Sequence, residues 1–274
     1  MSEHLPTQAW RHIDNGPSSG SLNMAIDESL LCLFNAERSV PILRTYAWDP
    51  PSLSLGRFQF SGEALDLDRC CSSAVSVVRR VSGGGTIYHA DELTYSVVCS
   101  PEQIPSTTSV KDSFRVLTGF LIDFYRRLGL NAHYAIDAVS NTERLGERTA
   151  FCFAGKESFD ILIDGKKIGG NAQRRGRNVI FQHGSIPIIN RAQQGLHYMK
   201  DRSPEYVYDT VSLSECGVSA DHTTLKGLLV DAFRHHLGVA TYVSDLSQEE
   251  DRLSQELMLK KYSSDRWNMQ GEVE

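Results

Sequence analysis

A cysteine flanked by two phenylalanines is the residue of this sequence best suited to covalent chemistry. Cys152 lies between Phe151 and Phe153. A thiol can form a thioester, and a nearby cation lowers its pKa so that the nucleophilic thiolate is available. Flanking phenylalanines suit an apolar acyl chain, but they suit a buried and inert cysteine equally well. The triplet alone therefore leaves both interpretations open.

A glycine-dense segment with two lysines could supply the cation. The segment GKKIGGNAQRR occupies residues 165–175, at the end of a predicted strand. Lys166 and Lys167 are adjacent, so in a strand their side chains point in opposite directions and only one can enter a site. A lysine beside closely packed backbone could meet an anionic or carbonyl oxygen. The alternative is a basic hairpin tip on the surface, and the segment by itself favours that alternative.

A run of three glycines could bring backbone amides close to a ligand. The sequence RRVSGGGT occupies residues 79–86. Glycine has no Cβ, so its backbone can approach a ligand closely. Arg79 and Arg80 could hold a phosphate or a carboxylate. The run is not a Walker A loop, because the Gly-Lys-Ser/Thr ending is missing, and it is not a Rossmann turn, because no helix follows. A tight turn with solvated arginines is the alternative.

The cysteines do not indicate a metal site or a disulfide framework. Six of them, at positions 32, 70, 71, 99, 152 and 216, show no CxxC spacing. The N-terminus, MSEH, has neither the basic nor the apolar region of a secretion signal, so free thiols and a cytoplasmic location are expected. Cys99 is a second candidate nucleophile, but it ends a predicted strand and is expected in the core.

Composition bounds the class of protein. The chain has 274 residues, 41% of them hydrophobic, which is enough for one large domain over residues 1–274. The net charge of −6 argues against a general binder of nucleic acid or anionic membrane. No apolar run approaches the length of a membrane span. We expect an enzyme without nucleic-acid, membrane or metal partners.

Four amphipathic helices are predicted around the strands. The first covers residues 21–36, with Ser21 as N-cap and Ile26, Leu30, Leu33 and Phe34 on one face. The clearest covers residues 110–128 and ends at Gly129, and its apolar face consists of Val110, Phe114, Leu117, Phe120, Leu121 and Phe124. Two further helices are expected at residues 223–237 and 247–261, the last opened by a capping box.

Strands are predicted between these helices. They cover residues 41–48, 53–56, 75–78, 86–99 with a break near 90–91, 159–167 and 179–189. Asp164 and Gly165 predict the turn of a hairpin, and residues 130–149 are expected to form a long loop. Strands surrounded by amphipathic helices predict an α/β or α+β domain.

The order of the motifs resembles the biotin/lipoate protein ligase superfamily, in its branch of lipoate-protein ligase A and octanoyltransferases. The strongest similarities are RRxSGGGxxxH at 79–89, GKKIGGNAQ at 165–173 and QHGS at 182–185. WRxID at 10–14, NMAxDE at 23–28, RxYxWxP at 44–50 and KYSSDxWN at 261–268 extend the resemblance over nearly the whole chain. It implies the ligase-like fold, a mixed β-sheet flanked by helices, without the accessory domain of the larger ligases.

The resemblance implies one of two chemistries. Ligases activate free lipoate with ATP and Mg. Octanoyltransferases of the LipM type need no cofactor: they take octanoate from acyl carrier protein through a cysteine thioester. They pass it to the lipoyl-domain lysine of glycine cleavage H protein or of a 2-oxoacid dehydrogenase E2. Cys152 followed by a hairpin and Lys167 resembles the transferases, whereas residues 82–85 and 170–172 are closer to the ligases. A non-catalytic lipoate-binding protein is a further alternative, and a biotin ligase is disfavoured.

By the same resemblance, Cys152 and Lys167 are the expected catalytic residues, and the bound group is octanoate or lipoate. His89 and His183 are either pocket residues or hydrogen-bonded structural histidines. The residues expected to bind substrate are Arg44, Arg79, Arg80, Ser82, Gly83, Gly84, Gly85, Thr86, Ile87, Tyr88, His89, Gly169, Gly170, Asn171, Ala172, Gln173, Gln182, His183 and Gly184.

Overall fold

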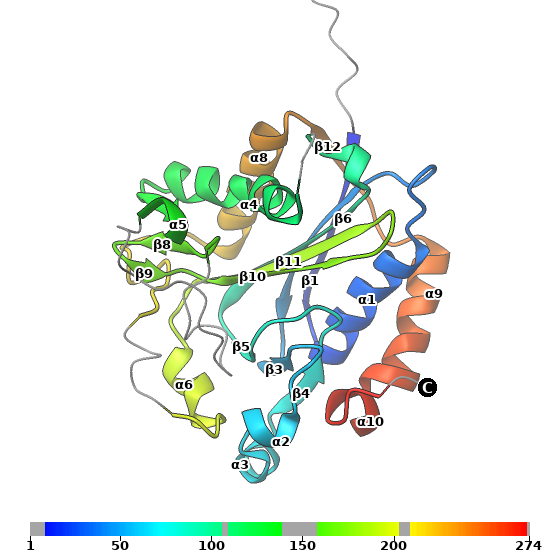
Figure 1. The fold of residues 1–274 in the computed structure, drawn as a ribbon, viewed down its shortest axis with the longest axis vertical. Helices are drawn as coiled ribbons and strands as arrows, with labels where there is room; N and C mark the ends of the chain where they lie inside the picture. The colour runs from blue at the N-terminus through cyan, green and yellow to red at the C-terminus, as the bar shows by residue number, and fades with distance from the viewer. Residues whose placement is uncertain (1–8, 106–108, 139–157, 203–208, 273–274) are drawn as a thin grey trace, which may run out of the picture.

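A mixed six-stranded β-sheet forms the centre of the fold (Figure 1) in the computed structural model, which describes residues 9–105, 109–138, 158–202 and 209–272. The strand order is β10-β11-β6-β2-β1-β12. β1 runs parallel to its two neighbours, and the other pairs are antiparallel. The bounds are β1 (Ala9–Ser18), β2 (Ile42–Trp48), β6 (Glu92–Cys99), β10 (Gly170–Arg175), β11 (Ile180–Pro187) and β12 (Ala240–Val243).

Helices cover both faces of this sheet (Figure 1), as the predicted fold class requires. On one face lie α4 (Val110–Arg127) and α8 (His222–Leu237), and on the other lie α1 (Gly20–Leu33), α9 (Gln248–Leu257), a π-helical turn (Met258–Tyr262) and α10 (Asp265–Asn268). Because successive strand residues point to opposite faces, β6 sends Tyr95 and Val97 into the apolar core below α4 and directs Thr94 and Ser96 towards α1. The α1 face therefore carries buried polar side chains.

A smaller three-stranded sheet holds the glycine run. Its order is β4-β3-β5, with bounds β4 (Ser76–Arg79), β3 (Ser52–Leu55) and β5 (Ile87–His89). The short helices α2 (Ser61–Ala64), α3 (Leu67–Ser72) and α6 (Ala192–His197) lie next to it (Figure 1), and its apolar cluster includes Leu53, Leu65 and Met199. The glycines at 83–85 connect β4 to β5.

The hairpin that carries Lys167 belongs to a third sheet, β7-β8-β9. Its strands are β7 (Ala132–Tyr134), β8 (Ile161–Ile163) and β9 (Lys166–Lys167). Asp164 and Gly165 have φ values of 50° and 76°, the left-handed pair that a two-residue hairpin needs, so the predicted turn is confirmed. Lys166 is exposed and Lys167 is buried, which confirms that the two side chains face opposite ways.

Most predicted elements are present, but some differ from the prediction in their first residue or in the residues that they bury. The helix predicted at 21–36 begins at Gly20, because Ser19 rather than Ser21 accepts the capping hydrogen bond, from the Leu22 amide. Val110 was expected on the buried face of α4 but is 57% exposed. The break predicted in the strand 86–99 is confirmed, since β5 ends at His89 and β6 begins at Glu92.

Some of the chain was predicted wrongly or not at all. The long loop expected at 130–149 contains β7 and α5 (Ala135–Ala138), and its remainder lies outside the described residues. β7 forms because its three residues pair with β8, nearly thirty positions later in the chain. β1, β10 and β12 were not predicted as strands. β10 in particular is polar and begins with glycine, so pairing with β11 determines its structure.

Gly169 fixes the path from the Lys167 hairpin into β10. Its φ is +74°, and a Cβ built there would lie 2.0 Å from the carbonyl oxygen of Ser185. Gly165 has the same left-handed conformation, at +76°, but a Cβ there would meet no atom within 4 Å. A β-carbon at Gly165 would therefore cause conformational strain alone, whereas a β-carbon at Gly169 would cause both conformational strain and a steric clash.

Replacing each glycine with alanine tests this assignment. Gly165→Ala should lower the free energy of unfolding by about 1 kcal/mol, the cost of a left-handed alanine. Gly169→Ala should cost several kcal/mol, on the order of 3–5, because the β-carbon also collides with the backbone of β11. Urea unfolding measures both values, and equal costs for the two substitutions would contradict the steric assignment.

Candidate active site

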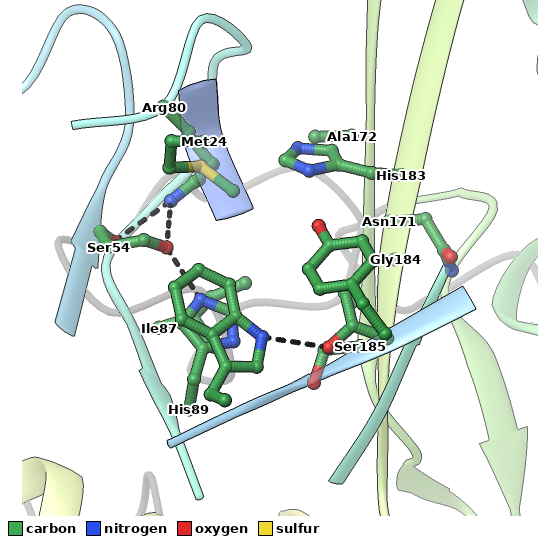
Figure 2. A pocket seen from close by; sticks show the side chains of 14 residues that line it. Met24, Ser54, Arg80, Ile87, His89, Asn171, Ala172, His183, Gly184 and Ser185 are labelled. Atoms are coloured by element: carbon green, nitrogen blue, oxygen red, sulfur yellow. Dashed lines mark hydrogen bonds between the residues drawn. The ribbon is translucent and has the colours of Figure 1, made fainter. Parts of the chain in front are cut away.

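A cavity lies between the small sheet and the α1 face of the central sheet (Figure 2). It has a volume of about 360 Å³, counting the space at its open side. The strands β2, β3, β5, β6, β10 and β11 all contribute to it, together with α1 and the segment after β4. The lining residues are Met24, Tyr46, Trp48, Ser54, Arg80, Ile87, His89, Thr94, Gly170, Asn171, Ala172, His183, Gly184 and Ser185.

A chain of hydrogen bonds runs along one wall (Figure 2). Arg80 Nη1, which can only donate, lies 3.1 Å from Ser54 Oγ. His89 Nδ1 lies 2.7 Å from Glu92 Oε1, and because a carboxylate only accepts, Nδ1 carries a hydrogen. His89 Nε2 lies 2.7 Å from Ser54 Oγ, and in a neutral imidazole with its hydrogen on Nδ1 this nitrogen accepts the Ser54 hydroxyl hydrogen.

A second chain ends at the same carboxylate. Trp48 Nε1, also a donor only, lies 2.9 Å from Thr94 Oγ1, so the Thr94 hydroxyl donates to Glu92 Oε1 at 2.6 Å. Ser185 donates to Glu92 Oε2 at 2.6 Å. The indole of Trp48 also stacks on His89, with ring centroids 3.8 Å apart. We call this set the Glu92 network: Arg80, Ser54, His89, Trp48, Thr94, Ser185 and Glu92.

His183 forms part of the opposite wall. Its Nε2 lies 2.5 Å from Ser82 Oγ, and its Nδ1 lies 3.9 Å from Asp27 Oδ2. Burial lowers the pKa of His183 well below the usual value, and the positive charge of Arg80 lowers it further. The imidazole is therefore neutral at physiological pH. Ser82 is buried and contacts His183, but it is not among the lining residues.

Arg44 was expected to bind substrate, but the structure places it inside a buried ion pair. Its side chain is fully buried, and Nη1 lies 2.8 Å from Asp27 Oδ1. Asp27 also accepts hydrogen bonds from Tyr46 and Ser96, at 2.9 and 2.7 Å. Burial raises the pKa of Tyr46 well above its usual value, and the charge of Asp27 adds to this effect. Arg44 therefore does not line the cavity. It pairs with Asp27, which in turn accepts a hydrogen bond from the lining residue Tyr46.

The two arginines before the glycine run bind backbone carbonyls. Arg80 Nη2 donates to the carbonyls of Gly83 and Gly85 at 2.8 and 2.7 Å, so it shapes the run. Arg79 is not a lining residue. Its guanidinium donates to carbonyl oxygens of Gly56, Arg57, Gln59, Trp267 and Met269. Arg79 therefore joins the small sheet to the segment 267–269 and does not face the cavity.

Of the other residues expected to bind substrate, some line the cavity and others do not. Gly83, Gly84, Gly85, Thr86, Tyr88, Gly169, Gln173 and Gln182 do not line it. Tyr88 instead lines a second cavity, with Glu92, Pro187 and Thr210. Ile87, His89, Gly170, Asn171, Ala172, His183 and Gly184 do line the first cavity.

Asn171 contributes its backbone to the lining, because its side chain is turned away (Figure 2). Its Oδ1 accepts the hydroxyl hydrogen of Tyr95 at 2.7 Å, on the α4 face of the sheet. Gln182 lies on that face too, and donates to Tyr95 and to the Leu117 carbonyl. A Cβ on Gly184 would lie 2.1 Å from Asn171 Oδ1, so only glycine leaves space for this arrangement.

Lys167 is buried beside a carboxylate. Its side chain is 4% exposed, and Nζ lies 2.8 Å from Asp160 Oδ2. Its backbone pairs with the segment around Thr210, through the amide of Val211. Lys167 is not a lining residue of the cavity, although Gly170 on the same segment is. Cys152, the expected nucleophile, lies outside the described residues, so its distance from Lys167 stays a prediction.

Four of the five described cysteines are weak alternative nucleophiles. Cys99 is fully buried and its pKa is raised to about 12, while burial raises the pKa of Cys70 to about 11. Burial also raises the pKa values of Cys32 and Cys216. Raised values disfavour the reactive thiolate. Cys99 is therefore a core residue, as its position at the end of a strand predicted.

Seven site residues were not predicted from the sequence: Met24, Tyr46, Trp48, Ser54, Glu92, Thr94 and Ser185. Two of them, Glu92 and Thr94, could have been identified. A strand with Glu92, Thr94 and Ser96 at alternate positions places polar groups on one face only. When the other face of the strand is apolar, such a row of polar residues indicates that the polar face contacts either solvent or a functional site.

Comparisons with known proteins identify relatives of this chain. Residues 19–237 match the lipoyl protein ligase A/B catalytic domain. Octanoyltransferase LipM of Kyrpidia tusciae is 34% identical over 272 residues, which cover 95% of this chain and 98% of that protein. Octanoyltransferase LipM of Bacillus subtilis (strain 168) is 31% identical over 278 residues, with coverages of 96% and 99%.

A solved structure of lipoate-protein ligase A bound with ATP has the same fold. Its TM-score is 0.80 at 25% identity, over 95% of this chain and 98% of that chain. The expected ligase-like fold is therefore confirmed. In the described part of the chain, no group of three or more histidine, cysteine, aspartate or glutamate residues is placed to hold a metal ion. Nor is any helix of that part both long and apolar enough to cross a membrane.

The lowered pKa of His183 predicts a pH dependence of stability. An unfolded histidine titrates near 6.5, whereas His183 in the folded protein stays neutral to lower pH. Below pH 6.5 the unfolded state binds the extra proton, so stability is present above that pH and falls as the pH falls. The slope due to His183 is at most about 1.4 kcal/mol per pH unit.

His183→Gln should reduce this slope between pH 6.5 and pH 5, because glutamine does not titrate. Urea unfolding of wild type and variant across pH 5 to 8 measures it. Above pH 7 the two stability curves should run parallel, which is the internal control. Parallel curves over the whole range would contradict the prediction.

Proposed function

The chain belongs to the lipoyl protein ligase A/B catalytic-domain family, and we propose that it is an octanoyltransferase of protein lipoylation. The observation that carries the proposal is identity of 31–34% to proteins named octanoyltransferase LipM, over nearly the full length of both chains. The cavity lined by Gly170, three residues after the buried Lys167, supports it.

The proposed reaction has two acyl-transfer steps through Cys152. Its thiolate attacks the octanoyl thioester of acyl carrier protein, which forms an enzyme thioester and releases the carrier thiol. The uncharged amine of the acceptor lysine then attacks that thioester. An amide forms, the Cys152 thiolate leaves, and the amine gives up a proton. The acceptor is a lipoyl-domain protein, such as glycine cleavage H protein or a dehydrogenase E2.

Lys167 has the electrostatic role in this proposal. Both steps develop negative charge on the acyl oxygen, and an ammonium group in a buried site stabilises such charge more strongly than it does in water. Asp160, at 2.8 Å from Nζ, holds the ammonium in place. The same positive charge would lower the pKa of a nearby thiol and so favour the Cys152 thiolate.

No ATP or Mg is needed when the donor is already a thioester. The fold is also similar to that of a lipoate-protein ligase A bound with ATP. The alternative function is therefore ligation, in which free lipoate is activated as an adenylate. The two functions differ in the substrate that they require, so one assay separates them.

Incubation with octanoyl carrier protein, without ATP, should add one octanoyl group to the protein. Mass spectrometry should detect the adduct, and hydroxylamine should remove it, because it cleaves thioesters. If no adduct forms, and acceptor modification appears only with free lipoate and ATP, the protein is a ligase.

Two substitutions assign the roles. Cys152→Ala should abolish the adduct and the transfer, whereas Cys71→Ala, at an exposed cysteine on α3, should leave both unchanged. Lys167→Ala should lower kcat by about 10²–10³, the usual effect of removing one oxyanion-stabilising group. Full transfer activity in Cys152→Ala would exclude the thioester route.

A further inference from the structure

A second cavity lies beside the first, and Glu92 connects the two. Glu92 lines the second cavity, and its carboxylate accepts hydrogen bonds from three residues that line the first: His89, Thr94 and Ser185. The lining of the second cavity is mixed: its apolar members include Ala90, Pro187 and Val211, and its polar members include Tyr88, Arg191 and Thr210. A chain that carries both apolar and hydrogen-bonding groups is suited to such a lining.

The segment that carries Lys167 borders both cavities. Gly170 lines the first cavity. The Lys167 carbonyl accepts a hydrogen bond from the Val211 amide at 3.0 Å, and Val211 lines the second cavity. The Lys167 amide donates to the neighbouring carbonyl of Asp209 at 2.8 Å. A thioester held at this segment is therefore next to two separate spaces.

A thioester donor has a substituent on each side of its carbonyl carbon. One is the acyl chain, which belongs in the first cavity under the proposed function. The other, on the sulfur, is the pantetheine arm of the carrier protein. This arm is a narrow chain of amide, hydroxyl and methyl groups that ends in a phosphate, so it requires apolar contacts, hydrogen-bond partners and a cation.

Arg191 supplies a cation to the second cavity. Its side chain is 34% exposed, and Nε lies 2.7 Å from Asp91 Oδ2. Among the described residues, neither Nη group of Arg191 has a hydrogen-bond acceptor. A guanidinium held through one nitrogen keeps the other two for a phosphate, which it binds with favourable geometry. Asp91 is 44% exposed, so water screens its opposing charge.

We propose that the second cavity binds the pantetheine arm of the octanoyl donor, with Arg191 on the phosphate of the arm. The proposal rests on the proposed function, because it concerns the group that the same reaction releases. The acceptor lysine is the other chain that must reach the thioester. Its ammonium would meet the like charge of Arg191, which favours the arm as the occupant.

Three small octanoyl thioesters contain progressively less of the arm: those of 4′-phosphopantetheine, pantetheine and N-acetylcysteamine. Mass spectrometry of the protein mixed with each donor, without ATP, gives a second-order rate constant for octanoylation. In the wild type this constant should fall by about 10-fold from the first donor to the second, the usual effect of losing one charge-assisted hydrogen bond. It should fall again for the third donor, which lacks most of the chain.

Two substitutions locate the arm. Arg191→Ala should lower the rate constant by about 10-fold for the phosphopantetheine donor and leave the constant for the pantetheine donor unchanged, because only the phosphate loses its partner. Ala192→Leu narrows the cavity at a partly buried lining position, so it should slow both of these donors and leave the N-acetylcysteamine donor unaffected.

Each substitution has a matched control. Arg126→Ala removes another arginine that is paired with one aspartate and partly exposed to solvent. Gln193→Leu adds a leucine at an exposed position of α6 that is not among the lining residues. Both control variants should have the rate constants of the wild type with all three donors.

The second half-reaction identifies the occupant. Each variant is loaded with an octanoyl group from the N-acetylcysteamine thioester and then mixed with the acceptor protein. All variants should modify the acceptor at the wild-type rate, because no arm is bound at that stage. Slower acceptor modification by Arg191→Ala or Ala192→Leu, together with normal loading by all three donors, would assign the cavity to the acceptor lysine and overturn the proposal.

Calorimetric binding of 4′-phosphopantetheine separates this proposal from the proposed function. Binding that Arg191→Ala weakens by about 10-fold, in a protein that none of the thioesters octanoylates, would overturn the transferase and keep the arm site. Equal rate constants for the three donors would overturn the arm site and keep the transferase.

Discussion

Two carboxylates buried on the α1 face of the central sheet organise the site. Glu92 accepts hydrogen bonds from His89, Thr94 and Ser185, and Asp27 accepts from Arg44, Tyr46 and Ser96. A buried charge is stable only when its acceptor positions are filled, so each carboxylate fixes the orientation of the groups around it. These groups come from strands of both the central and the small sheet, and Asp27 itself lies on α1. The cavity is therefore the space that the two hydrogen-bonded clusters enclose.

The sequence predicted what short-range patterns determine. Apolar periodicity predicted α4, the Asp164-Gly165 pair predicted the β8-β9 hairpin, and strand alternation predicted that Lys166 and Lys167 face opposite ways. β10 was not predicted, because its polar residues form a strand only by pairing with β11. A local pattern contains no information about such a partner.

The candidate site was predicted in part, for the same reason. The motifs placed His89, His183 and Gly170 in one site, and all three line the cavity. The partners of the arginines were harder to predict, because a guanidinium can donate hydrogen bonds to an anion or to several carbonyl oxygens equally well. Arg44 and Arg79 are both buried against protein groups, which depends on contacts distant in sequence. For Glu92 the sequence shows a polar residue in a strand, and its role follows from partners on β5, β6 and β11.

The contacts of Arg79 have a consequence for biosynthesis. This side chain leaves the end of β4 and donates to the carbonyl of Trp267, 188 positions further along the chain, while Trp267 Nε1 donates back to the Arg79 carbonyl. During translation, the small sheet and the glycine run therefore emerge from the ribosome long before the segment that completes them. Until that segment arrives, one half of the cavity lacks its support. The small sheet should therefore reach its final structure only after the segment 267–269 has been synthesised.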